Sequence, residues 1–213
     1  MKERAGSLGL DDVKVAVVGG DITVRAAGDS EQSLRALGQT GALAFRPVAT
    51  LSASSAGNCE TLRREATTRK SGFVALCGAE GALGAKDSEA VDYLLAPPSL
   101  VGSDVARATA RRDPSRGAWV VSLSFTAKGS VKFADVTGEL ATQPSPENQF
   151  AIVLDEKVLS APAVSYSIDG GQAEISGTFT KASARELASL IEGGALPVRL
   201  NVSSVTRFPA ASD

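Results

Sequence analysis

Short β-prone runs joined by tight turns recur along the chain, and they alternate with helical patterns. Residues 13–18 and 22–26 flank Gly19-Gly20-Asp21, a turn in which glycine can supply the positive φ angles of a hairpin. In residues 119–125, large apolar side chains alternate with smaller or polar ones, which indicates a strand with one buried face. Further strands are predicted over residues 42–48, 73–76, 93–95, 105–110, 150–154, 158–161, 173–176 and 197–205.

Two amphipathic segments predict helices between these strands. Thr180 can cap a segment whose apolar residues recur at spacings of three and four, and Gly193-Gly194 end it. Thr126 can cap a similar segment. The apolar residues are Ala184, Leu187, Ala188 and Ile191 in the first, and Phe133, Val136 and Leu140 in the second. Shorter helices are expected over 29–38, capped by Asp29 or Ser30, and over 60–68. This order predicts an α+β fold of antiparallel sheets covered by helices on one face.

The charge and hydropathy of the chain exclude several classes of partner. Its 213 residues include 22 basic and 24 acidic side chains, and no basic block exceeds two residues, so nucleic acid is not an expected partner. No apolar run approaches the ~20 residues of a transmembrane helix. The sequence therefore offers no candidate transmembrane helix.

The residues that usually carry catalysis are scarce. The chain contains no histidine, which removes the usual general base, the usual metal ligand and any Ser-His-Asp arrangement. The acid pair Asp11-Asp12 lies near one end and Asp155-Glu156 lies in a turn, and we interpret both as solvated carboxylates. Trp119 and the phenylalanines are interpreted as core residues rather than as the lining of a ligand groove. We assign no catalytic, cofactor-binding or metal-binding residue.

The stretch from residue 49 to 84 differs from the rest, because Ser, Ala, Gly and Thr dominate it and its apolar periodicity is weak. It is interpreted as an insertion, with a loop over residues 78–84. Cys59 and Cys77 lie 18 positions apart, which excludes a four-thiolate zinc site. Two alternatives remain, a single disulfide or two unpaired buried thiols.

Several longer motifs carry a resemblance to a known family. Residues 150–162, FAIVLDEKVLSAP, strongly resemble the signature AIVLDGKVxSAP of SecD, a subunit of the bacterial protein-export machinery. Residues 170–180 resemble its GGxAxISGxFT and residues 193–198 its GALPV, whereas residues 121–135 look like its FxxxGxxKFA element and residues 41–48 its LEFRPV. The segments keep the family order and span residues 13–48 and 90–206. One departure is Glu156, which replaces the glycine of the family's turn.

The resemblance implies a function in protein export. SecD spans the membrane several times, pairs with SecF beside the SecYEG channel and uses the proton gradient to draw preproteins outward. The chain looks like its first large extracytoplasmic domain, so the expected function is to bind emerging unfolded preprotein and to change conformation. The resemblance implies that the full-length protein lies in the cell membrane, with this domain on the extracytoplasmic side. Contact with the membrane is then expected only through transmembrane helices that are absent from this sequence. The alternative is a free-standing extracytoplasmic solute-binding or adhesion domain.

The resemblance also implies a division into lobes. We expect a ferredoxin-like base from residues 10–49 and 197–213, a family-atypical connector over 50–98, and an inserted head lobe over 99–196 with antiparallel strands and two helices. The hinge candidates are Pro47, Gly193, Gly194 and Pro197, where Gly and Pro interrupt regular structure. Because the family's domain faces an oxidising compartment, a disulfide between Cys59 and Cys77 is predicted. No cofactor is expected.

Overall fold

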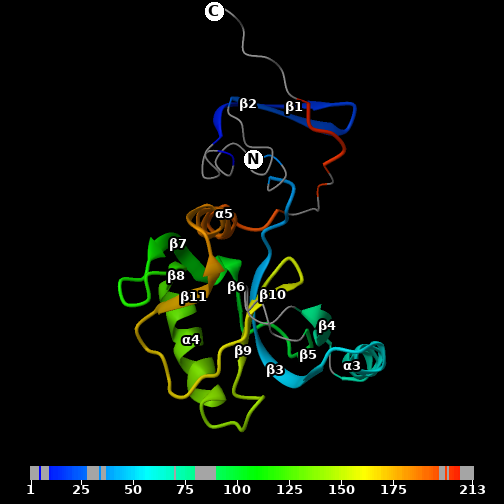
Figure 1. Ribbon diagram of the computed structural model, residues 1–213, viewed down its shortest axis with the longest axis vertical. Helices are drawn as coiled ribbons and strands as arrows, with labels where there is room; N and C mark the ends of the chain where they lie inside the picture. The colour runs from blue at the N-terminus through cyan, green and yellow to red at the C-terminus, as the bar shows by residue number, and fades with distance from the viewer. Residues whose placement is uncertain are drawn as a thin grey trace, which may run out of the picture.

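The computed structural model describes residues 5, 10–27, 34, 37–69, 71–79, 90–196, 200 and 202–206. This part of the chain is mixed α/β, with antiparallel sheets and three α-helices, which confirms the predicted α+β class (Figure 1). The helices are α3 (Ala56–Thr68), α4 (Ala127–Leu140) and α5 (Lys181–Glu192). The strands are β1 (Asp11–Val18), β2 (Asp21–Ala27), β3 (Leu43–Ala53), β4 (Val74–Ala79), β5 (Val91–Leu95), β6 (Leu100–Val101), β7 (Val105–Arg112), β8 (Trp119–Phe125), β9 (Phe150–Leu154), β10 (Lys157–Ser160) and β11 (Gln172–Phe179).

The larger sheet has the strand order β10-β9-β3-β5-β4, and β6 pairs separately with β3. Strand β3 is central because it pairs with β9 through residues 43–47 and with β5 through residues 48–53. Pro47 lies inside β3 opposite Phe150, and it is tolerated there although proline cannot donate a backbone hydrogen bond. This sheet combines segments that the sequence assigned to base, connector and head, so the division into lobes stays a prediction.

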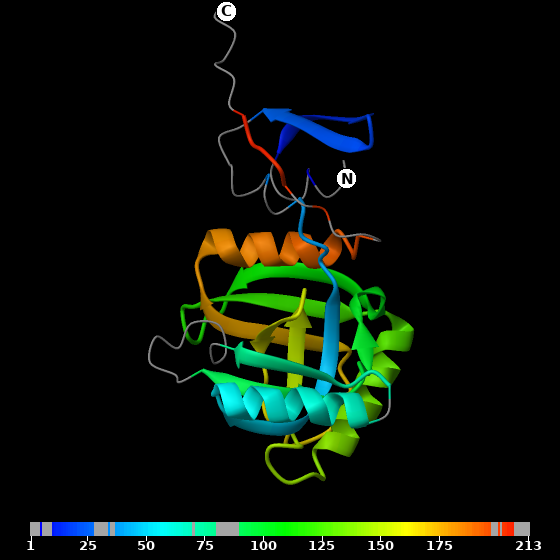
Figure 2. The same cartoon turned by 90° about the vertical axis from the view of Figure 1, so that its right-hand side faces the viewer.

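The second sheet, ordered β11-β8-β7, shares its core with the larger one. Figure 2 shows α5 lying across β7 and β8 at one side of the molecule, whereas α3 lies at the opposite side against β4 and β5. Between the two sheets, four phenylalanine rings pack together with centroid separations from 4.6 to 6.5 Å. They are Phe45, Phe125, Phe133 and Phe150, all buried, which confirms their interpretation as core residues.

Helix α4 is fixed against the loop before β7 by a very close approach. A Cβ atom added at Gly129 would lie 2.2 Å from the carbonyl oxygen of Asp104, so only glycine fits there. That oxygen accepts the backbone N–H of Thr126, the N-cap of α4, at 2.8 Å. The Asp104 carboxylate also receives the Nζ of Lys132 at 2.8 Å. Gly129 and Lys132 of the FxxxGxxKFA element therefore hold α4 against Asp104 and do not form an exposed binding site.

The segment from residue 50 to 79 is better ordered than its composition indicates. Strand β3 continues to Ala53, α3 begins at Ala56 rather than near residue 60, and β4 reaches Ala79 and pairs with β5. Gly78 and Ala79 thus belong to a strand, and the rest of the loop predicted over 78–84 lies outside the described residues. Helix α3 has a single buried residue, Leu62, which explains its weak apolar pattern.

The first hairpin forms a separate small unit. Strands β1 and β2 pair antiparallel, and their apolar face packs on Leu10, Leu34 and Leu37. We call the described residues of 10–37 the hairpin unit and residues 43–193 the main body; Figure 1 shows the unit above the main body. The closing strand predicted over 197–205 does not form at those of its residues that are described, 200 and 202–205. Residues 202–206 line a cavity of about 350 Å³ together with residues of β2. The helix predicted over 29–38 falls largely outside the described residues.

Candidate functional site

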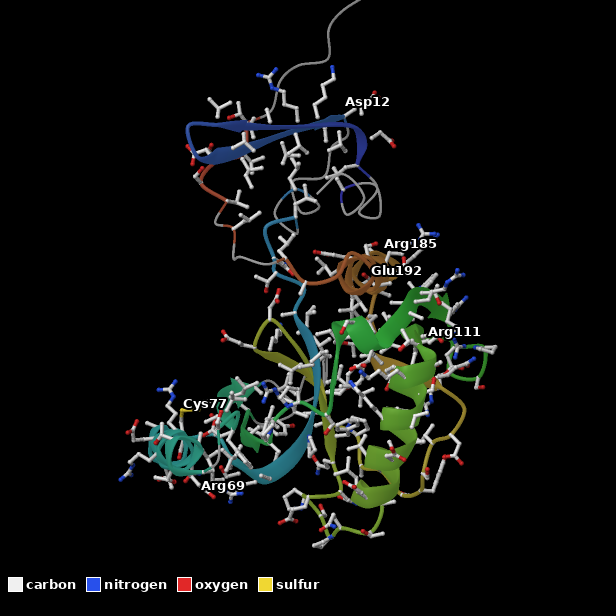
Figure 3. The ribbon with its side chains drawn as sticks, turned by 180° about the vertical axis from the view of Figure 1, so that it is seen from behind. Asp12, Arg69, Cys77, Arg111, Arg185 and Glu192 are labelled. Carbon is white, nitrogen blue, oxygen red and sulfur yellow. A yellow bond between two sulfur atoms is a disulfide. The ribbon has the colours of Figure 1, made fainter. Side chains whose placement is uncertain are left out.

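The acid pairs predicted to be solvated differ from one another. Asp11 and Asp12 are exposed at the start of β1, and Figure 3 shows Asp12 on the hairpin unit, far from Arg111 and Glu192 of the main body. Asp155, in contrast, is half-buried and accepts several hydrogen bonds. Its interpretation as a solvated turn carboxylate is therefore wrong.

Within the ranges that the structure describes, no group of three or more His, Cys, Asp or Glu side chains is placed to hold a metal ion.

Asp155 binds the segment that joins the hairpin unit to the main body. Its carboxylate accepts the hydroxyl of Thr40 and the backbone N–H groups of Gly41, at 3.0 Å, and Ala42, at 2.8 Å. The returning segment lies beside the same residues, since the N–H of Leu196 donates to the carbonyl of Thr40 at 2.7 Å. The AIVLDGKVxSAP and GALPV motifs thus meet where the chain crosses between the two parts. We call residues 38–42 and 193–196 the crossing.

Two of the four hinge candidates, Gly193 and Gly194, lie in the crossing, and the other two do not. Gly193 ends α5 with φ −67°, and Gly194 follows with φ +65°, a left-handed conformation that favours glycine. Pro47 lies inside β3, in the main body. Pro197 lies outside the described residues. The hinge itself stays a prediction.

The turn that holds Asp155 has an unusual backbone. Asp155 and Glu156 connect β9 to β10 with φ values of 49° and 68°, the pattern of a two-residue type I′ turn. Glycine and asparagine are favoured at such angles, and glutamate is not. Glu156, which stands where the family has glycine, therefore adopts a strained conformation.

An open apolar cavity of about 370 Å³ lies between α4, β9 and the segment that precedes β11. Three rings of the phenylalanine cluster line it, although each of these side chains is at most 4% exposed. Tyr166 lies at its rim and is 73% exposed, the most exposed large apolar side chain in the described part of the chain. The other main contributors are Phe45, Phe133, Phe150, Ile152 and Ile168. This cavity suits an apolar side chain of a bound partner.

A disulfide and a buried carboxylate hold the opposite side of the main body. Cys59 of α3 and Cys77 of β4 are joined, with their Cα atoms 5.6 Å apart, and Figure 3 shows Cys77 beside this helix. The fully buried Asp92 of β5 accepts hydrogen bonds from the Ser54 hydroxyl at 2.7 Å and the Gly78 N–H at 2.8 Å. Burial raises the pKa of Asp92, but these hydrogen bonds outweigh it, so the pKa lies below its ordinary value.

The sequence alone could not find two of these features. Tyr166 lies in a segment without regular structure, where no periodicity marks a functional side chain. The partners of Asp155 lie 113 to 115 positions away in the chain. The only signal for Asp155 was its place in the family signature.

Comparisons with known proteins agree on one family. Residues 81–198, more than half of the chain, match the family described as "SecDF, P1 head subdomain". The protein translocase subunit SecD of Streptomyces coelicolor is 48% identical over 120 residues, covering 56% of this chain and 21% of that protein. SecDF of Thermus thermophilus is 40% identical over 111 residues, covering 52% and 14%. The chain spans about a fifth of the length of the first curated relatives.

Solved structures extend the similarity to nearly the whole chain. One, described as a membrane component SecDF that enhances protein export, is 29% identical with a TM-score of 0.64, covering 97% of this chain and 89% of that one. SecDF in a super-membrane-facing form is 30% identical with a TM-score of 0.65, covering 95% and 26%. In the part of this chain that the structure describes, no helix is long and apolar enough to span a membrane.

Proposed function

Because the chain belongs to the SecD/SecDF family of protein translocase subunits and contains the P1 head subdomain, we propose that it holds unfolded preprotein during export. The family match over residues 81–198 carries this proposal. The chain is not proposed to be an enzyme, since its named relatives are translocase subunits. The proposed partners are unfolded preprotein and, through the full-length protein, SecF and the SecYEG channel, with the domain on the extracytoplasmic side.

The apolar cavity at Tyr166 supports a binding function. Binding must be weak and tolerant of sequence, because a translocation factor has to release each segment that it holds. An open cavity lined by aromatic and aliphatic groups contacts many apolar side chains without demanding one. A small solute-binding domain would instead be expected to enclose its ligand, and this cavity is open at Tyr166.

The crossing supports a change of conformation. Residues 38–42 connect the hairpin unit to the main body, and residues 193–196 lie beside them, since the N–H of Leu196 donates to the carbonyl of Thr40. Bending within residues 38–42 would move the hairpin unit relative to the main body, and Gly194, with its positive φ, would let the neighbouring segment follow. The hydrogen bonds that Asp155 accepts from Gly41 and Ala42 would hold one of the two positions. A hinge of a few residues at the ends of elements is sufficient for such a motion.

The test is to fix the crossing and to measure two activities. Thr40→Cys and Leu196→Cys together place two thiols on neighbouring segments, so oxidation joins them; each single variant is the matched control. We expect the joined form to bind unfolded polypeptide in the isolated domain but to lose export in the full-length protein. Unchanged export in the joined form would exclude the hinge. Failure of the unmodified domain to bind or crosslink any unfolded polypeptide would exclude the binding function.

A further inference from the structure

Strand β4 forms an outer edge of the larger sheet, and its edge differs from the other outer edges. The two larger sheets end in β10, β4, β11 and β7. Three of these strands carry charged side chains: Lys157 in β10, Glu174 in β11 and several arginines in β7. Charges of this kind keep other strands from pairing with an exposed edge. Strand β4, with the sequence VALCGA, has no charged residue and no proline.

The backbone of β4 offers unpaired groups on its outer side. The N–H of Ala96 donates to Pro47 of β3, so along β5 the even-numbered amides face β3 and the odd-numbered amides face β4. Tyr93 and Leu95 are opposite Leu76 and Val74. Leu76 and Val74 therefore turn their N–H and C=O groups toward β5, and Ala75 between them turns its own outward. In the described ranges, no strand pairs with that side of β4.

The space beside this edge is open. A cavity of about 430 Å³ lies between residues 75–79 of β4, Arg63 of α3 and residues 156–158 of the β9–β10 hairpin, so charged side chains line it opposite the strand. It adjoins a groove of about 800 Å³ that runs along β3 and α3, and Ala75 and Leu76 line both. The strands β4 and β10 lie near one another without pairing. The outer edge of β4 therefore borders two adjoining cavities, whereas Val74, Leu76 and Ala79 of the same strand pack against the apolar cluster that contains Val158.

Strand β4 is also fixed in place by its contacts with α3 and β5. The disulfide ties Cys77 to α3, and the buried Asp92 of β5 accepts the N–H of Gly78. A fixed template loses little conformational freedom when it binds, which lowers the cost of association. The segment without family motifs thus builds a preformed, uncharged strand edge.

We propose that the outer edge of β4 binds an extended segment of unfolded polypeptide as an added strand. The proposal rests on the proposed function and adds a second contact for the same polypeptide, besides the cavity at Tyr166. Strand addition uses backbone hydrogen bonds, which every polypeptide offers, so it suits clients of many sequences. Ala75 is the central contact because both of its backbone polar groups point outward.

The test compares Ala75→Pro with Ala75→Val in the 213-residue chain. Proline removes the outward N–H without disturbing the pairing with β5, because proline is tolerated at such edge positions. Valine keeps the N–H and favours a strand. The probe is reduced, carboxymethylated α-lactalbumin, which stays unfolded. We expect Ala75→Pro to weaken probe binding by about fivefold to tenfold, the loss expected from one backbone hydrogen bond. Ala75→Val should bind within about twofold of the unmodified chain.

Amide hydrogen exchange gives a second measurement that does not depend on a variant. The Ala75 amide should exchange more slowly when the probe is bound to the unmodified chain. If Ala75→Pro unfolds, this protection decides the question. Equal binding by a folded Ala75→Pro and by Ala75→Val, or no protection at Ala75, would overturn strand addition and leave the proposed function standing. Failure of the unmodified chain to bind the probe would overturn both.

Discussion

Replacing Gly129 by alanine should lower the free energy of unfolding of the protein, although alanine favours helices. The added methyl group would lie 2.2 Å from the Asp104 carbonyl oxygen and 3.0 Å from its carbon, so α4 must move by nearly 1 Å. Overpacking of this kind costs about 1–3 kcal/mol. Losing the Thr126 N–H bond to the same oxygen adds about 1 kcal/mol, and the helix propensity of alanine returns about 1 kcal/mol. The net loss is about 1–3 kcal/mol.

Gly138 provides the matched control on the same helix. A Cβ atom there would meet only Ser167, at an ordinary 3.7 Å, so Gly138→Ala should gain up to about 1 kcal/mol. Urea unfolding followed by circular dichroism measures both variants, and the midpoints should move in opposite directions at an unchanged slope. Equal stability of the two variants would refute the close approach of α4 to Asp104.

Three further predictions concern local interactions. Thiol titration of the unfolded, unreduced protein should find no free thiol, and reduction should cost about 3 kcal/mol in the chain-entropy account of the 18-residue separation; two reactive thiols would contradict the disulfide. Glu156→Gly should raise the free energy of unfolding by about 0.5–1 kcal/mol, and with it the urea midpoint, because it relieves the φ of 68°; a lower midpoint would show that the turn is not strained. Hydrogen bonds and the Lys132 charge outweigh burial and hold the pKa of Asp104 below its ordinary 3.8, as hydrogen bonds do for Asp92. The stability that these carboxylates add is therefore complete above the unfolded pKa and is lost as the pH falls through the folded one. Melting curves should show that Asp104→Asn flattens this acid loss; an unchanged acid loss would exclude Asp104 as a cause.

Where the apolar pattern was strong, the sequence predicted the elements well. Both α4 and α5 begin after the expected caps Thr126 and Thr180, and each buries the predicted apolar face. Strand β8 alternates as predicted from Val121 to Phe125, whereas Trp119 is only half-buried and Val120, on the opposite face, is buried. In these segments the apolar pattern of the sequence agrees with the tertiary packing, so the pattern alone predicts which side chains are buried.

The prediction was weakest where tertiary contacts replace an apolar pattern. Helix α3 buries only Leu62 and is fixed by a disulfide, and β4 is positioned through the buried Asp92. Neither contact leaves a periodic signal in the sequence. The side chain of Asp155 was misjudged for the same reason, since its hydrogen-bond partners at Gly41 and Ala42 are remote in sequence. Long-range polar contacts require the fold before they can be recognised.

The most direct test of the central claim is site-specific photocrosslinking during export. A photoreactive phenylalanine analogue replaces Tyr166, at the rim of the apolar cavity, in the full-length protein, and Val131 on the exposed side of α4, 62% exposed, is the control position. With a preprotein arrested in transit, we expect crosslinks from position 166 to the preprotein and few from position 131. Equal crosslinking from both positions, or none from position 166, would contradict the proposal that this domain holds the preprotein at that cavity.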